Sequence, residues 1–336
     1  MSRAGEGLPY LSRLAQSCVQ RGAWYLYLMP HHRPLAGIGL DEPVRLDLPA
    51  VEEHHIEEFL SSQVPTPHRQ LFDSTGFARF GFHLCAGARC RVDLIMTVGG
   101  PALVMHFLPD PLPGPEELNT SEEVLDLVAN GPGLFLICGK PRSGKTTTLA
   151  SVLQYMNATS FRYIAWLCGA AEYLLAPGRA FVNQVETGHL MYGSGPVETA
   201  VWMGADVVAL DLQVDDKLAW QAVLAAERGA RVFMVLPACD TANGLQNLAN
   251  TVNSDLRREF IARLSEVFGG ALYQELVRGI KAPVAVMEIL VGTDPVRNLL
   301  KEGKFAQLPD LIHAGGKYGM QTLEAARKRL SDEGLI

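Results

Sequence analysis

Residues 139–146 read Gly-Lys-Pro-Arg-Ser-Gly-Lys-Thr, and this stretch matches the phosphate-loop pattern at every required position. An apolar run, 134–138, precedes it, and a segment typical of a helix, 145–157, follows it. The motif therefore stands in the strand–loop–helix context that it needs. A chance match in a glycine-rich chain is the alternative, and the flanking strand and helix argue against it.

The residue types in this loop suit a triphosphate. Successive backbone N–H groups form a nest for an anion, and the helix N-terminus adds the positive end of its dipole. Lys145 would reach the β- and γ-phosphates, and the Thr146 hydroxyl would hold Mg²⁺. The expected ligands are therefore ATP and Mg²⁺, although a phosphate loop does not select the base. The candidate binding residues are Gly139, Lys140, Pro141, Arg142, Ser143, Gly144, Lys145, Thr146 and Thr147.

Length and composition limit the class of protein. The chain has 336 residues, which suggests two domains of unequal size. Hydrophobic residues make up 48% and charged residues 19%, so the chain can bury a sizeable core. A formal charge of −7 without a basic tract argues against nucleic-acid binding. No apolar run approaches ~20 residues, so we expect a cytoplasmic protein without direct membrane insertion.

Cysteines and histidines form no metal pattern in the sequence. Only Cys85 and Cys90 are a close pair among the six cysteines, and no second pair completes a zinc site. Reduced thiols that fill core space are therefore expected. The histidine pairs at 31–32 and 54–55 lack a third ligand at a suitable spacing, so solvated histidines are favoured.

A proline-rich stretch divides the chain. Four prolines in 109–115 cannot extend a helix or a central strand. We therefore predict an N-terminal domain at 1–108, a linker at 109–118 and a nucleotide-binding domain at 119–336. Thr120 and Glu123 would form a capping box at the start of the first helix after the linker.

Hydrophobic periodicity predicts the elements of both domains. Before the linker, candidate helices at 9–20 and 51–63 and strands at 24–29, 78–84, 89–96 and 103–107 indicate an α+β domain with antiparallel strands. After it, strands at 133–138, 162–167, 206–211, 231–236 and 284–290 alternate with helices at 145–157, 216–228 and 256–268. This alternation predicts an α/β domain with a mostly parallel sheet covered on both faces. Residues 295–329 read as short helices, and Trp166 and Trp202 are expected to pack in the core.

Two C-terminal segments carry a family resemblance. Residues 292–300 read Gly-Thr-Asp-Pro-Val-Arg-Asn-Leu-Leu, and residues 314–323 read Ala-Gly-Gly-Lys-Tyr-Gly-Met-Gln-Thr-Leu. Both resemble the signature of the PilT-type retraction ATPases of type IV pili. The resemblance covers nearly the whole chain and implies a PAS-like N-terminal domain followed by a RecA-like ATPase domain. It assigns Arg297, Asn298 and Gln321 to a segment needed for retraction, with ordinary helix-surface polarity as the alternative.

The resemblance also implies partners. A homo-hexamer, or a mixed hexamer with an active paralogue, would bind the platform protein of the pilus machine at the inner membrane. Membrane contact would then be made through partners alone.

The chain departs from this family at groups that the family uses for hydrolysis. Leu212 stands where the family has its Walker B glutamate, and Asp211 precedes it at the end of the apolar strand. Asp211 is therefore either a ligand of Mg²⁺ or a solvated strand-end aspartate. Of the family's acidic box, which falls at 168–172, Glu172 alone remains. It is either a displaced catalytic base or a surface glutamate.

Further departures concern the charge on the phosphates. Pro237 replaces the family's histidine, the family's arginine fingers fall on Gly99 and His106, and a further family arginine falls on Trp202. Arginine fingers are worth ~10³–10⁵ in rate, so hydrolysis is expected to be near background. Binding can persist, because backbone groups supply much of the phosphate affinity. Lys140 and Arg142 would add positive charge, or would form a solvated face of the loop.

These observations leave three functions open. The first is a nucleotide-binding member of the pilus machinery with impaired or absent hydrolysis and a regulatory or assembly role. The second is an active retraction motor in which Asp211 binds Mg²⁺ and Glu172 is the base. The third is a structural adaptor that binds no nucleotide, which the intact loop disfavours.

Overall fold

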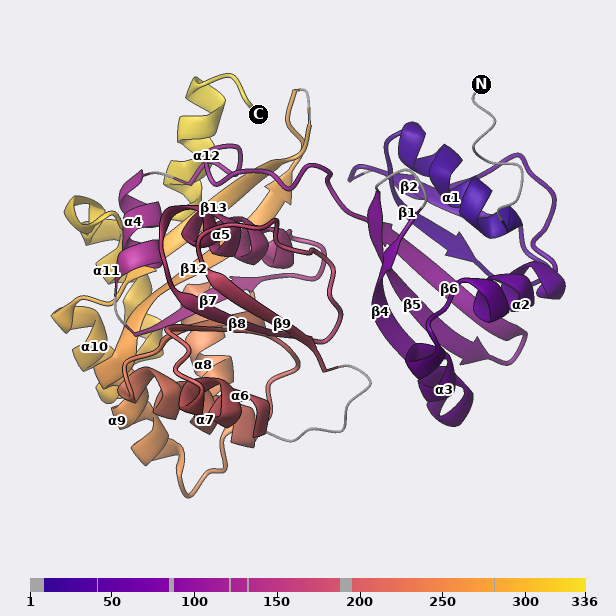
Figure 1. The fold of residues 1–336 in the computed structure, drawn as a ribbon. Helices are drawn as coiled ribbons and strands as arrows, with labels where there is room; N and C mark the ends of the chain where they lie inside the picture. Colours follow the sequence, from indigo (N-terminus) through magenta and orange to yellow (C-terminus); the bar gives the residue numbers. More distant parts are fainter. Residues whose placement is uncertain are drawn as a thin grey trace. The chain divides into compact units, whose positions relative to one another are not determined.

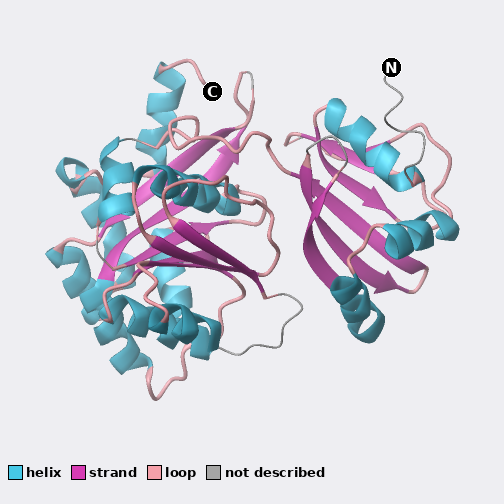
Figure 2. Cartoon of the chain, viewed as in Figure 1, coloured by secondary structure: helices cyan, strands magenta, loops and turns pink. Residues whose placement is uncertain are grey.

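The structure, a computed structural model, describes residues 9–336 except 41, 85–87, 121, 132, 188–194 and 281. These residues form two compact units (Figures 1 and 2). Unit 1 extends to Pro111 and also contains Gly169–Leu174 and a segment that starts at Glu186. Unit 2 contains Leu112–Cys168, Leu175–Val185 and the later part of the chain.

Unit 1 is built on an antiparallel sheet with the strand order β3-β2-β1-β6-β5-β4. Its strands are β1 (Ala23–Leu28), β2 (Leu35–Ile38), β3 (Val44–Arg45), β4 (Phe77–His83), β5 (Arg89–Thr97) and β6 (Gly100–Phe107). Its helices are α1 (Tyr10–Gln20), α2 (Glu53–Ser62) and α3 (Thr66–Thr75). The predicted α+β domain with antiparallel strands is therefore confirmed.

Strand β5 shows how alternation builds the core of unit 1. Cys90, Val92 and Leu94 are fully buried in a cluster with residues of α1, α2 and α3. Because successive side chains of a strand point to opposite faces, Arg91 and Asp93 lie on the face away from these helices. The sheet therefore has one apolar face under the helices and a second face that carries charged groups.

Sequence reasoning missed β2, β3 and α3. The two strands have four and two residues, which is too short for a convincing alternation. Helix α3 nevertheless carries start and stop signals, because Pro67 lies in its first turn and Gly76 caps its end in the left-handed region.

Unit 2 is built on a seven-stranded sheet with the order β13-β12-β7-β11-β10-β8-β9. Its strands are β7 (Leu134–Gly139), β8 (Tyr163–Cys168), β9 (Phe181–Glu186, whose last residue belongs to unit 1), β10 (Val207–Asp211), β11 (Arg231–Pro237), β12 (Phe268–Val277) and β13 (Val284–Val291). The pairs from β12 through β7, β11 and β10 to β8 are parallel, and β12 pairs with β13 in antiparallel fashion. The prediction of a mostly parallel α/β sheet is confirmed.

Helices cover both faces of this sheet (Figure 1). They are α4 (Glu122–Asn130), α5 (Lys145–Thr159), α6 (Gly195–Trp202), α7 (Asp216–Glu227), α8 (Thr241–Thr251), α9 (Arg257–Val267), α10 (Asp294–Lys301), α11 (Leu308–Ala314) and α12 (Leu323–Asp332). Leu134 and Leu136 of β7 pack into the cluster that includes α7 and α8. Phe135 and Ile137 face the opposite way and line a small apolar cavity with Val128 of α4.

The largest omission of the sequence analysis is β12, a ten-residue strand between β7 and β13. Its first seven residues are buried, so it lacks the alternation of a half-exposed strand. It also begins with Phe268 directly after α9, and two glycines follow, so it reads as the end of a helix. This strand proves to be the neighbour of the phosphate loop.

Two expectations about single side chains are wrong. Trp166 is fully buried as expected, but Trp202 is 73% exposed because it ends α6 at the surface. Cys18, Cys90, Cys138 and Cys168 are buried, whereas Cys239 is exposed in the turn before α8. Burial raises the pKa of the Cys90 and Cys138 thiols to about 12, so both stay protonated near neutral pH. Cys85 and the side chain of Glu123 lie outside the described residues.

The chain approaches itself closely just before β7 and β12, and this contact leads to a stability prediction. Gly133 has φ +93°, and a Cβ there would lie 2.0 Å from the carbonyl oxygen of Val267. We expect Gly133→Ala to lower the free energy of unfolding by more than ~3 kcal/mol, since backbone strain and a clash with main chain act together. Gly204→Ala is the matched control, because Gly204 has φ +85° but no atom within 4 Å of its Cβ position. Urea unfolding of both variants checks this, and equal losses would contradict it.

Candidate nucleotide-binding site

The phosphate loop joins the buried strand β7 to helix α5. The Gly144 backbone has φ +85° and Arg142 has φ +66°, so the loop makes two left-handed turns before the helix begins. Lys145 folds back over the loop, and its Nζ donates to the carbonyl oxygens of Gly139 at 3.0 Å and Lys140 at 2.7 Å. The lysine charge is therefore held at the mouth of the loop, where a phosphate would take the place of these carbonyls.

Helix α5 forms the second part of the candidate anion site. Its first N–H groups lie at the end of a fifteen-residue helix, which concentrates positive potential there. Thr146 and Thr147 lie in its first turn and are partly exposed, whereas Thr148 is buried. The loop thus has the geometry of a phosphate site, with the Thr146 hydroxyl beside Lys145 as the expected place for Mg²⁺.

Strand β12 contacts the loop through residues that the sequence analysis did not single out. The Gln274 amide donates to the carbonyl oxygen of Ser143 and accepts from Thr148. The Glu275 carboxylate lies 3.4 Å from Lys140 Nζ and accepts from Arg327 of α12 at 2.6 Å. A hydrogen bond from Tyr273 and these two cations hold the pKa of Glu275 below its ordinary value. The available sequence signal for these contacts was the adjacent polar pair Gln274 and Glu275 within a run of buried strand residues.

Asp211 ends β10 at the carboxyl edge of the sheet. Strand β11 alone separates β10 from β7, and these strands are parallel, so Asp211 and the phosphate loop follow the same edge. Leu212, the next residue, packs against the core of unit 2. Pro237 ends β11 directly beside Gly139, at the position where a histidine was expected from the family resemblance.

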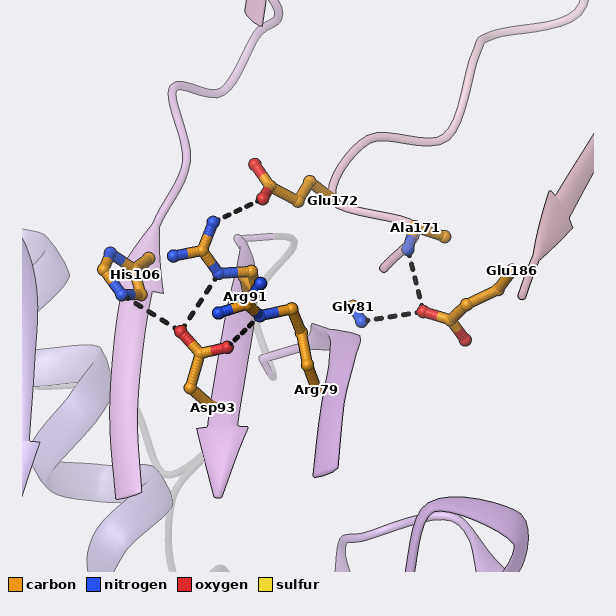
Figure 3. Close-up of polar contacts among 8 residues, drawn as sticks. All are labelled: Arg79, Gly81, Arg91, Asp93, His106, Ala171, Glu172 and Glu186. Atoms are coloured by element: carbon orange, nitrogen blue, oxygen red, sulfur yellow. Dashed lines mark hydrogen bonds and ion pairs between the residues drawn. The ribbon is translucent and has the colours of Figure 1, made fainter. Parts of the chain in front are cut away.

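Glu172 belongs to unit 1 and is held by arginines (Figure 3). Its Oε1 lies 2.6 Å from an Arg91 nitrogen, and its side chain is 12% exposed. The Arg89 guanidinium also donates to the main-chain oxygen of Glu172 at 3.0 Å. The alternative of a solvated surface glutamate is therefore wrong, because the carboxylate is largely buried and ion-paired.

Asp93 is the centre of the charged face of unit 1. It contacts Arg79, lies 3.2 Å from Arg91 and 3.3 Å from His106 (Figure 3). Burial by itself would raise the pKa of the Asp93 carboxyl, but the hydrogen bond from His106 and the two arginines hold it well below its ordinary value. His106, one of the two positions where the family resemblance led us to expect an arginine finger, thus contacts a carboxylate within its own unit. Gly99, the other position, has no side chain to offer.

Glu186 fixes the second segment of unit 1. Its carboxylate accepts from the backbone N–H groups of Gly81 at 3.2 Å and Ala171 at 2.8 Å (Figure 3). It also lies 3.2 Å from His68. Although burial would raise the pKa of Glu186, these donors keep it below its ordinary value. Residues 169–172 are thus anchored at main chain and side chain alike.

No group of three or more histidine, cysteine, aspartate or glutamate side chains that could hold a metal ion occurs among the described residues. His31 and His54 instead lie near single glutamates, Glu53 and Glu52. Within the described part of the chain, no helix combines the length and the apolar character needed to span a membrane.

Comparisons with known proteins identify the family. The chain is 30% identical over 330 residues to the type IV pilus retraction ATPase PilT of Pseudomonas aeruginosa, and the match covers 97% of this chain and 95% of that protein. The chain belongs to the PilT family of retraction ATPases. A twitching motility protein of Neisseria gonorrhoeae is 27% identical, over 87% of this chain and 79% of that protein. No family model matches the chain.

The solved structures agree with this membership. A crystal structure of the pilus retraction motor PilT with bound ADP is 25% identical and matches with a TM-score of 0.80, over 97% of this chain and 94% of that one. The PilT-like ATPase fold is therefore confirmed. In that relative the bound nucleotide is ADP.

The charged face of unit 1 predicts a pH-dependent stability. The folded pKa of Asp93 is depressed, so its contribution is present above the unfolded pKa of ~3.9 and is lost as pH falls through the folded value. We expect Asp93→Asn to lower the free energy of unfolding by about 2 kcal/mol at pH 7. The gap between variant and wild type should shrink as the pH falls below ~4.

The control is Asp73→Asn, because Asp73 is an exposed residue of the same unit with one weak partner at 4.0 Å. It should change stability little at any pH. Urea unfolding of the three proteins across pH measures the gap, and a gap that stays constant down to pH ~2 would refute the role given to Asp93.

Proposed function

We propose that this chain binds ATP with Mg²⁺ at residues 139–147 and hydrolyses it slowly or not at all. The observation that carries the proposal is a contrast between two sites. The phosphate loop has the geometry of an anion site with Lys145 at its mouth. Glu172, the remaining carboxylate of the acidic box, is occupied by Arg91 in unit 1.

Hydrolysis requires more than binding of the phosphates. A base must orient water, and cations must neutralise the charge that develops on the transferred group. Here Leu212 and Pro237 have no group for either task, and His106 contacts Asp93. Asp211 is the remaining candidate for Mg²⁺ at the carboxyl edge. We therefore expect the chain to bind ATP without fast turnover.

Family membership supports a place in the type IV pilus machinery. We propose a regulatory or assembly role at the cytoplasmic face of the inner membrane, within a homo-hexamer or in a mixed hexamer with an active paralogue. The pilus platform protein would be the partner that holds the ring to the membrane. The support for this part is the relative's role as a retraction ATPase, together with nearly complete coverage of its length.

An active retraction motor is the second candidate, and the position of Asp211 favours it. Asp211 ends β10, which β11 alone separates from β7, so it lies on the same edge of the sheet as the phosphate loop. In this alternative Glu172 would have to exchange Arg91 for a water molecule during turnover.

Nucleotide binding should depend on Lys145. We expect Lys145→Ala to weaken binding of Mg·ATP about 10- to 100-fold, because a charge-assisted contact to the phosphates is lost. Isothermal titration calorimetry of the full chain measures this. Lys301→Ala is the control, since Lys301 forms an exposed pair with Glu266 and should leave affinity unchanged. A wild-type chain that takes up no nucleotide would favour the structural adaptor instead.

Turnover separates the first two candidates. We expect phosphate release from Mg·ATP near the Lys145→Ala background, and no further loss in Glu172→Gln or Asp211→Asn. A coupled phosphate assay on the purified chain, alone and at high protein concentration to allow ring formation, measures the rates. A Lys145-dependent rate of ~1 s⁻¹ or more that falls in both carboxylate variants would establish the motor.

A further inference from the structure

Gln274 lies beside the phosphate loop in the centre of unit 2. Strand β12 pairs with β7 in parallel, and the Cα of Gln274 is opposite that of Gly139. The residue is 1% exposed although its side chain is polar. A buried amide is stable only where its donor and its acceptor both find partners.

Both hydrogen-bond partners of this amide lie in the phosphate loop or in the helix that follows it. Nε2 donates to the carbonyl oxygen of Ser143 at 2.7 Å, and Oε1 accepts from the Thr148 hydroxyl at 2.6 Å. Ser143 is the last loop residue before Gly144, and Thr148 lies at the end of the first turn of α5. One side chain therefore joins the loop to the helix that follows it.

The loop passes close to Gln274 at both glycines of the motif. A Cβ on Gly139 would lie 2.6 Å from the main-chain oxygen of Gln274, and a Cβ on Gly144 would lie 2.8 Å from its Nε2. The two glycines of the motif therefore serve the approach of β12 as well as the turn of the loop.

We propose that Gln274 is a positioning residue for nucleotide binding, an inference that rests on the proposed function. The C=O and N–H of a trans peptide point in opposite directions. When Gln274 holds the Ser143 carbonyl toward β12, the N–H of Gly144 points away from β12 and is available to a phosphate. Gln274 also occupies the Thr148 hydroxyl, which is therefore not the hydroxyl that would meet phosphate or Mg²⁺.

A purely structural role makes a different prediction, and Asn157 distinguishes the two. Asn157 is a fully buried amide near the other end of α5, where it donates to the carbonyl oxygen of Ala176 and accepts from the N–H of Ala180. If Gln274 merely stabilised unit 2, loss of either amide would lower the free energy of unfolding. The two variants would then have the same nucleotide affinity.

The first experiment compares Gln274→Met with Asn157→Leu in the full chain. The dissociation constant of a fluorescent ATP analogue with Mg²⁺ is measured for each, together with urea unfolding. We expect Gln274→Met to bind about tenfold more weakly and Asn157→Leu to bind within about twofold of wild type. Wild-type affinity in Gln274→Met, or an equal loss in both variants, overturns the proposal.

The second experiment uses pH and also serves if Gln274→Met does not fold. In Gln274→Glu the carboxylate can still accept from Thr148, but it cannot donate to Ser143 unless it is protonated. The pKa of a carboxyl buried beside a carbonyl oxygen is raised. The affinity of this variant relative to wild type should therefore recover at least about threefold between pH 8 and pH 6. A ratio that is constant over this range overturns the proposal.

A double-mutant cycle with Thr148→Val completes the test. Loss of the Thr148 hydroxyl should weaken nucleotide binding. The effects of Gln274→Met and Thr148→Val should be less than additive, because both variants remove the same hydrogen bond. Full additivity contradicts the shared contact. Failure of the proposed function appears differently, since the wild-type chain would then bind no analogue at all.

Discussion

The pairing of β7 between β11 and β12 is the constraint on which the candidate nucleotide site depends. A strand that is hydrogen-bonded on both edges cannot shift its register without breaking two ladders. Its last residue, Gly139, is therefore held between Pro237 and Gln274. The position of the first loop residue is therefore fixed. Lys145 and Gln274 supply the most direct further contacts that hold the loop.

The sequence predicted this part of the molecule well because its signals are local. The phosphate loop is a contiguous motif, and five strands of unit 2 are short apolar runs between helices. Strand β12 was missed because it is buried along most of its length and follows α9 without a turn. Gln274 and Glu275 were missed together with this strand, because their significance depends on contacts between residues more than 130 positions apart in the chain.

The surroundings of Glu172 could not be predicted for a related reason. Nothing near Glu172 in the sequence indicates that Arg91 would neutralise it, since the contact spans 81 positions. The same holds for His106, whose partner Asp93 lies on the neighbouring strand. The family resemblance led us to expect that catalytic groups are missing, whereas the ion pairs show what Glu172 and His106 contact.

The chain path through unit 1 has a consequence for dissecting the protein. Unit 1 is not made of one continuous stretch, because Gly169–Leu174 and Glu186 belong to it although they lie far beyond the proline-rich linker. A fragment cut at that linker would take Arg91, His68 and the Gly81 N–H away from Glu172 and Glu186, so the segments that carry these two carboxylates would lose the contacts that hold them. Neither half is a self-sufficient piece, and exchange of the N-terminal half with that of a relative would have to carry these two short insertions along.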